Sequence, residues 1–97
     1  MKRTESQTLK EVLNHFLDEN PLLRSKLLET RLINAWEIIL GKLAQQYTDR
    51  IYIRNKVLHV HLSSSVLKNE LIICKEELVL QLNQVVGEKV ISSIILY

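Results

Sequence analysis

The spacing of the apolar residues changes once along the chain, and this change most limits what the chain can fold into. Up to residue 43 apolar side chains recur every three or four positions, whereas from Ile51 to Leu62 they recur at every second position. The first spacing is typical of amphipathic helices, and strict alternation is typical of half-buried strands. The sequence therefore predicts helices followed by an antiparallel hairpin, and 97 residues suit one domain over residues 1–97.

Two helical stripes precede the hairpin. The first is Leu9, Val12, Leu13, Phe16 and Leu17, and the second is Leu32, Ala35, Trp36, Ile39, Leu40 and Leu43. Thr8 and Glu11 form a capping box that predicts the start of the first helix, and Asn20-Pro21 predicts its end. The pattern leaves open whether residues 22–46 form one helix or two.

The remaining elements follow from turn and capping residues. Asn55-Lys56 fits a two-residue hairpin turn, since Asn tolerates positive φ. Ser63-Ser64-Ser65 offers caps for a long helix that ends before Gly87. The apolar stripe of that helix is Leu67, Leu71, Cys74, Leu78, Leu82 and Val85, and the β-branched residues 90–96 predict a third strand.

The order α-α-β-β-α-β predicts a two-layer α+β domain, with the helices on one face of a three-stranded sheet. We expect burial of Leu13, Phe16, Leu67, Leu71, Leu78, Ile51, Ile53, Leu58 and Val60. Tyr52 and His59 should be much more exposed than Ile51 and Val60. The order resembles that of K-homology-like domains, which are small nucleic-acid-binding modules, although the GxxG loop of true K-homology domains is absent.

Composition and charge exclude several classes of protein. The net charge is only +2, but residues 21–56 carry seven basic and three acidic residues, so the middle third is basic. No apolar run is long enough for a membrane span, and nothing resembles a secretory signal, so we expect a cytoplasmic protein. The single cysteine, Cys74, cannot form an internal disulfide and is expected to be a buried apolar residue.

The polar face of the predicted sheet is the strongest candidate for a functional surface. Alternation places basic and aromatic side chains on it, and the candidate nucleic-acid-binding residues are Arg50, Tyr52, Arg54, Lys56, His59, His61 and Lys42. Basic groups neutralise phosphates and rings stack on bases, which is what a single-strand or backbone binder with weak sequence preference requires. The alternative is a solvated sheet face without function.

Other candidate sites receive less support. Trp36, Ile38 and Leu40 form a candidate partner-binding patch, although the position of Trp36 on the helical stripe also fits core packing. His59 and His61 share a strand face but lack a third metal ligand, so we expect no metal. The serine cluster is explained by capping, and no nucleophile accompanies His15. We therefore expect no enzymatic activity, no cofactor and no small-molecule substrate.

One segment has a more specific resemblance. Ala35-Trp36-Glu37-Ile38-Ile39-Leu40-Gly41-Lys42-Leu43-Ala44, followed by Tyr47-Thr48, is similar to the signature of the bacterial DciA family of replicative-helicase loaders. The hairpin, the serine-rich turn and Asn69-Glu70-Leu71 also resemble that family, over roughly residues 9–97. The resemblance implies a K-homology-like fold, DNA binding and the replicative helicase as partner. The alternative is a protein-interaction or RNA-binding module with no role in replication.

Overall fold

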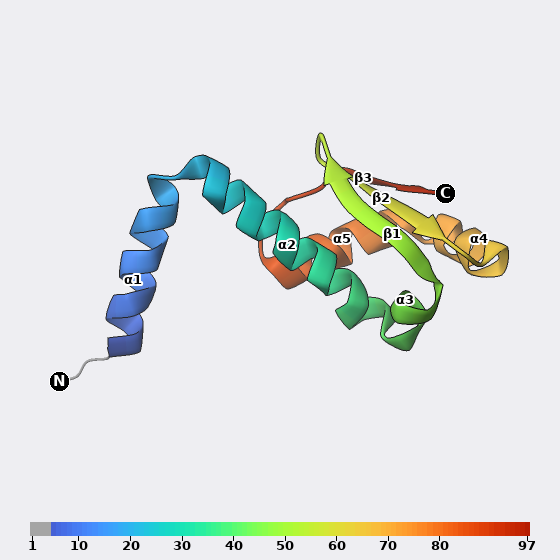
Figure 1. Cartoon of the computed structure of the whole chain (residues 1–97), viewed down its shortest axis with the longest axis horizontal. Helices are drawn as coiled ribbons and strands as arrows, with labels where there is room; N and C mark the ends of the chain where they lie inside the picture. Colours follow the sequence, from blue (N-terminus) through green and yellow to red (C-terminus); the bar gives the residue numbers. More distant parts are fainter. Residues whose placement is uncertain (1–4) are drawn as a thin grey trace.

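The computed structural model describes residues 5–97, and side chains from Thr8 onward; residues 1–4 of the expected domain lie outside the described residues. The elements are α1 (Glu5–Asp18), α2 (Pro21–Leu40), α3 (Lys42–Tyr47), β1 (Thr48–Arg54), β2 (Val57–Leu62), α4 (Ser65–Ile73), α5 (Lys75–Val86) and β3 (Ser93–Leu96). Helices pack on a three-stranded sheet (Figure 1), which confirms the predicted α+β class and order. Among the described residues no helix combines the length and hydropathy that crossing a membrane requires.

The sheet has the strand order β1-β2-β3, with an antiparallel and a parallel pairing. Asn55 and Lys56 both have positive φ, at 54° and 62°, which is the geometry of the two-residue turn that matches strand twist. β3 then lies parallel to β2, because α4 and α5 carry the chain back along the sheet before β3 begins.

A bulge at the start of β1 shifts the alternation by one residue. Thr48 pairs with Leu62 and Arg50 pairs with His61, so Asp49 is the extra residue. The bulge turns Thr48 toward the helices while Arg50 points to the opposite face. On the helix-covered face, the indole Nε1 of Trp36 donates a hydrogen bond to Thr48 Oγ1 at 3.1 Å.

The core lies between the sheet and helices α2 and α5, which also pack on each other. Its largest fully buried side chains are Trp36, Leu32, Leu58, Leu82, Ile91, Ile94 and Val60. Leu71 and Leu78 are buried as expected, and Leu67, Ile51 and Ile53 are half-buried against this core. One face of the sheet is therefore covered by helices and the other is open.

Residues 22–46 form two helices, which answers the question that the sequence left open. The first of them, α2, is continuous from Pro21 to Leu40. Pro21 occupies its first turn, where the missing N–H costs nothing. The helix ends at Gly41, whose φ of 61° and ψ of −132° lie outside the region that other residues adopt readily. The chain changes direction at this glycine and continues as the short helix α3.

The expected burial of Leu13 and Phe16 is wrong, since they are 47% and 49% exposed. α1 begins earlier than the capping box at Thr8 predicts. It lies before the corner at Asn20, projects away from the sheet and makes appreciable contact with α2 alone among the described elements (Figure 1). The radius of gyration of 16.0 Å reflects this projection, because a compact chain of 100 residues has a value of about 13 Å. The apolar stripe of α1 therefore has no sheet to cover.

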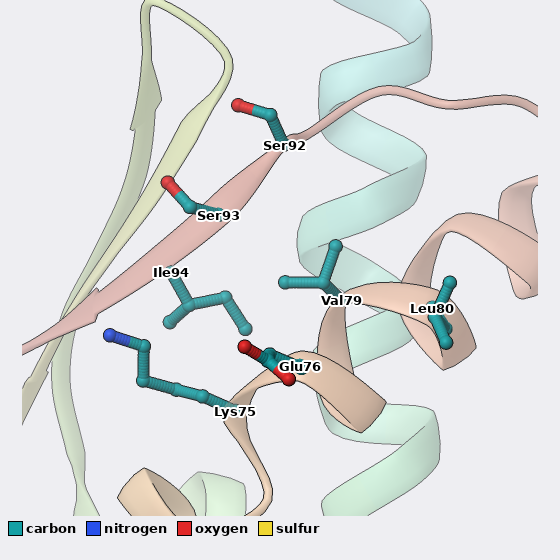
Figure 2. Close-up of a pocket in the computed structure, with 7 residues that line it drawn as sticks. All are labelled: Lys75, Glu76, Val79, Leu80, Ser92, Ser93 and Ile94. Atoms are coloured by element: carbon teal, nitrogen blue, oxygen red, sulfur yellow. The ribbon is translucent and has the colours of Figure 1, made fainter.

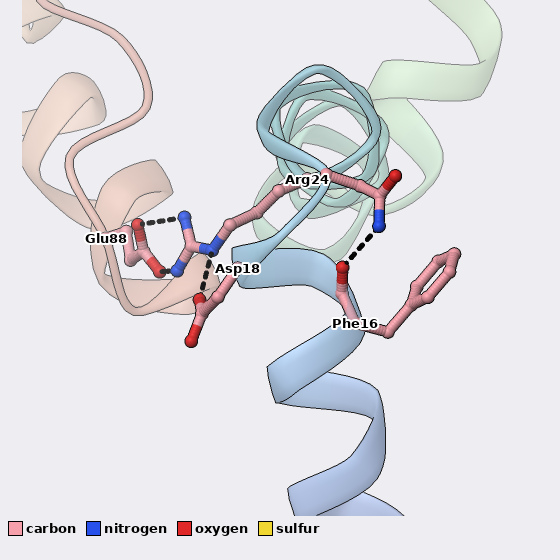
Figure 3. Close-up of polar contacts among 5 residues, drawn as sticks. Phe16, Asp18, Arg24 and Glu88 are labelled. Carbon is pink, nitrogen blue, oxygen red and sulfur yellow. Dashed lines mark hydrogen bonds and ion pairs between the residues drawn. The ribbon is translucent and has the colours of Figure 1, made fainter.

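Polar contacts hold the corner between α1 and α2. The guanidinium of Arg24 donates hydrogen bonds to both carboxylate oxygens of Glu88 and lies 3.9 Å from Asp18 Oδ1 (Figure 3). Asn20 Nδ2 donates to the carbonyl oxygen of Phe16 at the end of α1. These contacts connect the corner with the segment after α5, but they leave the apolar stripe of α1 uncovered.

The long helix expected after the serine cluster is also divided. Ser64 caps α4 as predicted, its hydroxyl accepting from Leu67 N–H at 3.1 Å, but the helix breaks at Cys74. The break changes the phase of the apolar stripe, so Leu78 and Leu82 are buried whereas Cys74 is exposed. The prediction of a buried cysteine is wrong for this reason. Gly87 ends α5 in the left-handed conformation, as expected.

Gly41→Ala should lower the free energy of unfolding by about 1–3 kcal/mol, measured by urea denaturation. No atom lies within 4 Å of the position that the new Cβ would take, so the loss comes from backbone strain alone. Gly87→Asn is the matched control, because asparagine adopts the left-handed conformation at small cost. Equal losses in the two variants would contradict this account.

Candidate nucleic-acid interface

The open face of the sheet carries the side chains that sequence alternation placed there. Tyr52 pairs with His59 across β1 and β2, and Arg50 pairs with His61. The neighbouring residues Ile51, Ile53, Leu58 and Val60 face the helices and pack in or against the core. The register predicted for the hairpin is therefore correct.

Four rings stack side by side across this face, and we call them the ring ladder: Tyr52, His59, His61 and Tyr97. The centroids of Tyr52 and His59 lie 4.9 Å apart with their planes at 11°. At the other end the centroids of His61 and Tyr97 lie 4.1 Å apart at 8°. A hydrogen bond of 2.8 Å joins His59 Nδ1 and the hydroxyl of Tyr97.

Tyr97 is the member of the ladder that sequence reasoning missed. It follows β3 directly, and its backbone N–H donates to the carbonyl oxygen of Val60, so it continues the parallel ladder. The signal was present in the alternation of the last strand, where Ile94 and Leu96 are buried while Ile95 and Tyr97 are exposed. Without the parallel pairing of β2 and β3, nothing placed Tyr97 beside His61.

The ring faces are largely occupied by contacts within the protein. Tyr52 stacks on both histidines, and the guanidinium carbons of Arg50 and Arg54 lie 4.8 and 5.6 Å from its centroid. For this reason Tyr52 is only half-exposed, like Ile51, and the expected contrast between these two residues does not hold. The contrast between half-exposed His59 and fully buried Val60 does hold.

The charge on this face is positive and unopposed. Arg50, Arg54 and Lys56 are exposed, and none of them forms an ion pair with the part of the chain that the structure describes. No acidic side chain alternates onto the open face, although Asp49 lies beside it at the bulge. Cation–π contacts orient the two guanidinium groups over Tyr52 and leave their N–H donors free for an anion.

Other residues proposed from the sequence lie elsewhere. Lys42 is exposed on α3 rather than on the sheet. Trp36 is 1% exposed, so it is a core residue and not a surface anchor, and Leu40 packs against the core. Of the candidate partner patch only Ile38 remains fully on the surface, at 69% exposure.

A second basic segment lies on α2, where Arg24, Lys26 and Arg31 follow one another within eight residues. Here Arg24 is committed to Glu88 and Asp18, and the hydrogen bonds from Arg24 hold the pKa of Glu88 below its ordinary value. Lys26 and Arg31 are exposed but lie on a helix without a neighbouring aromatic ladder. The open sheet face is therefore the better assembled of the two basic surfaces.

The histidines show no metal-binding arrangement. Among residues 8–97, whose side chains are described, no three His, Cys, Asp or Glu side chains are grouped to hold a metal ion. His61 Nε2 is buried without a hydrogen-bond partner, and His59 is engaged with Tyr97. Both histidines instead stack on the rings of Tyr52 and Tyr97.

The chain is a small two-layer α+β domain with one helix-covered sheet face and one open face that carries basic and aromatic side chains. The particular family follows from the sequence comparison. The family model described as "Dna[CI] antecedent, DciA" matches residues 8–96, and the chain belongs to this family. It is a family of helicase loaders, which connects the protein with DNA replication. No curated protein and no solved structure gives a match.

Tyr52→Ala should lower the free energy of unfolding by about 1–2 kcal/mol, because it removes a stacked ring and the surface that orients two arginines. Tyr52→Phe keeps the ring and should change stability by less than about 0.5 kcal/mol. Urea denaturation of both variants measures the difference. Equal stability of the two would show that the ring ladder adds nothing to the fold.

Proposed function

We propose that this protein is a non-enzymatic, DNA-binding accessory of chromosome replication that contacts the replicative helicase in the cytoplasm. The observation that carries the DNA-binding part is the pair of guanidinium groups held over Tyr52 on an open sheet face without opposing acids. Membership in a family of helicase loaders supports the helicase part. A K-homology-like mode of binding agrees with the α+β order.

The binding energy in this proposal comes mainly from phosphate contacts. Arg50, Arg54 and Lys56 supply about three such contacts on the sheet and at its turn, and Lys42, which is exposed on α3, supplies a fourth. Phosphates carry no sequence information, so the preference for sequence is weak. Because the faces of Tyr52 are occupied, stacking of a base is favoured at Tyr97, at the other end of the ring ladder.

Single-stranded DNA should bind with a log–log salt slope of about −2 to −3, measured by fluorescence anisotropy. Replacing Arg50 and Arg54 together by Ala should flatten the slope by about one to two units, because each arginine releases about one counterion. Both side chains are exposed, so the fold should persist.

The matched control is the double variant Lys26→Ala, Arg31→Ala, which removes the same charge from an exposed face of α2. Its slope should stay close to that of the unchanged protein. A larger loss in the α2 variant than in the sheet variant would place the DNA site on α2. RNA of the same sequence tests the alternative of an RNA-binding module, which requires clearly tighter binding to RNA.

The helicase should co-purify with the tagged protein from native cytosol, and should remain bound after nuclease treatment. A direct protein contact does not need DNA, whereas two proteins bridged by DNA separate when the DNA is digested. The Arg50→Ala, Arg54→Ala variant should retain the helicase. Loss of the helicase on nuclease treatment would remove the second half of the proposal and leave DNA binding.

A further inference from the structure

The two edges of the sheet differ in how well they are protected. At the β1 edge a bulge at Asp49 and two charged residues of the strand, Arg50 and Arg54, discourage pairing with another strand. β3 at the other edge reads Ser-Ile-Ile-Leu and has neither a charge nor a bulge. An apolar, unguarded edge strand is a template for β-pairing.

Backbone groups at the β3 edge are available for such pairing. Both backbone groups of Tyr97 face β2: its N–H donates to the carbonyl oxygen of Val60, and its C=O accepts from the N–H of Leu62. Because backbone groups alternate along a strand, those of Ile94 and Leu96 point to the free edge. Among the described residues, none of the backbone hydrogen bonds outside the regular helices and strand pairings involves Ile94 or Leu96.

A groove runs beside this edge, between β3 and α5. One hollow of about 460 Å³ is lined by Lys75, Glu76, Val79, Leu80, Ser92, Ser93 and Ile94. A second hollow of about 690 Å³ adjoins it and shares Val79, Leu80 and Ser92. Figure 2 shows Lys75, Glu76 and Val79 on the side of α5 that faces Ile94.

We propose that an extended segment of a partner protein adds to the β3 edge as a fourth strand and places an apolar side chain in the groove beside α5. Main-chain hydrogen bonds to Ile94 and Leu96 give the affinity, and the groove gives the specificity. This site is independent of the proposed DNA-binding function, since it uses an edge and a groove rather than the charged side chains of the open face.

The size of the edge favours a peptide segment over a second copy of this chain. Two paired β3 strands of four residues run together for only about 13 Å, and a stable dimer needs about 800 Å² from each partner. A single extended segment fits better, because it pairs with the edge and also fills the groove.

The surroundings indicate the chemistry of the segment. Val79, Leu80 and Ile94 line the groove, so the residue that enters it is aliphatic. The next residue along lies over Ile95, which is 41% exposed on the open face, and apolar cross-strand neighbours are favoured there. Lys75 and Glu76 form no ion pair among the described residues, so they can accept charged residues that flank the apolar ones.

Selection of a phage-displayed library of random dodecapeptides tests the site. Peptides with alternating aliphatic residues should be enriched, and their affinity should fall at least about tenfold in Leu80→Glu, because the new charge must be desolvated in the groove. Leu80 is 61% exposed, so this variant should fold. Val66→Glu, at an exposed position of α4 outside the groove, is the matched control and should bind normally.

A backbone variant tests the pairing itself. Cys74 allows native chemical ligation: residues 1–73, prepared as a C-terminal thioester, are joined to a synthetic segment 74–97 that begins with this cysteine and is N-methylated at Leu96, and the thioester's thiol is released. The methyl group removes only the N–H at the free edge, so peptide binding should be lost while DNA binding and urea stability stay unchanged. In the unmodified protein, peptide should slow hydrogen exchange at Ile94 and Leu96.

Three results would overturn the proposal. The first is that no peptide is enriched. The second is that enriched peptides bind the Leu80→Glu and N-methylated chains as tightly as the unchanged one. The third is that analytical ultracentrifugation shows a dimer that N-methylation abolishes. The last result would make a second copy the occupant of the edge. Loss of DNA binding in the Arg50→Ala, Arg54→Ala variant with peptide binding intact would separate this site from the proposed DNA-binding function.

Discussion

The contact between the indole of Trp36 and Thr48 fixes how the helices meet the sheet. A buried indole N–H needs an acceptor, and Thr48, which accepts the hydrogen bond from Trp36, is placed inward by the bulge at Asp49. The same bulge sets the phase of everything that follows on β1. Arg50 and Tyr52 reach the open face in register with His61 and His59 because Thr48 is held on the inner one. Core packing and surface chemistry are therefore set by one local irregularity.

Much of this arrangement is readable from the sequence, because apolar periodicity reports which face of an element is covered. Alternation over residues 51–62 predicts the hairpin, its turn and its register correctly, since a slip of one residue would have exposed the whole apolar set. Asn20-Pro21 and Gly87 likewise mark real helix ends, because their backbone restrictions are local.

Apolar periodicity fails to predict burial where burial depends on how segments distant in the sequence are arranged in space. The stripe on α1 looks like a core stripe, but whether a sheet lies beneath Leu13 and Phe16 depends on the direction that the chain takes after Asn20. The stripe through Cys74 requires an unbroken helix, and the break there is not marked by glycine or proline. Tyr97 joins the site only through parallel pairing between distant segments, so no local pattern assigns it to the ring ladder.

The sequence predicts the rings as open platforms on which bases stack. In the structure most of the ring faces instead contact one another or orient the two arginines.

The parallel pairing of β3 with β2 also has a consequence for the synthesis of the protein. Ile91, Ile94 and Leu96 are the last core residues to be synthesised among residues 8–97, whose side chains the structure describes. The core around Trp36 and Leu58 cannot close until residue 96 has emerged from the ribosome, and non-local strand pairing forms slowly because a long loop must be ordered first. The nascent chain therefore carries an incomplete apolar core until residue 96 has emerged, and apolar surface that is exposed during this time favours aggregation.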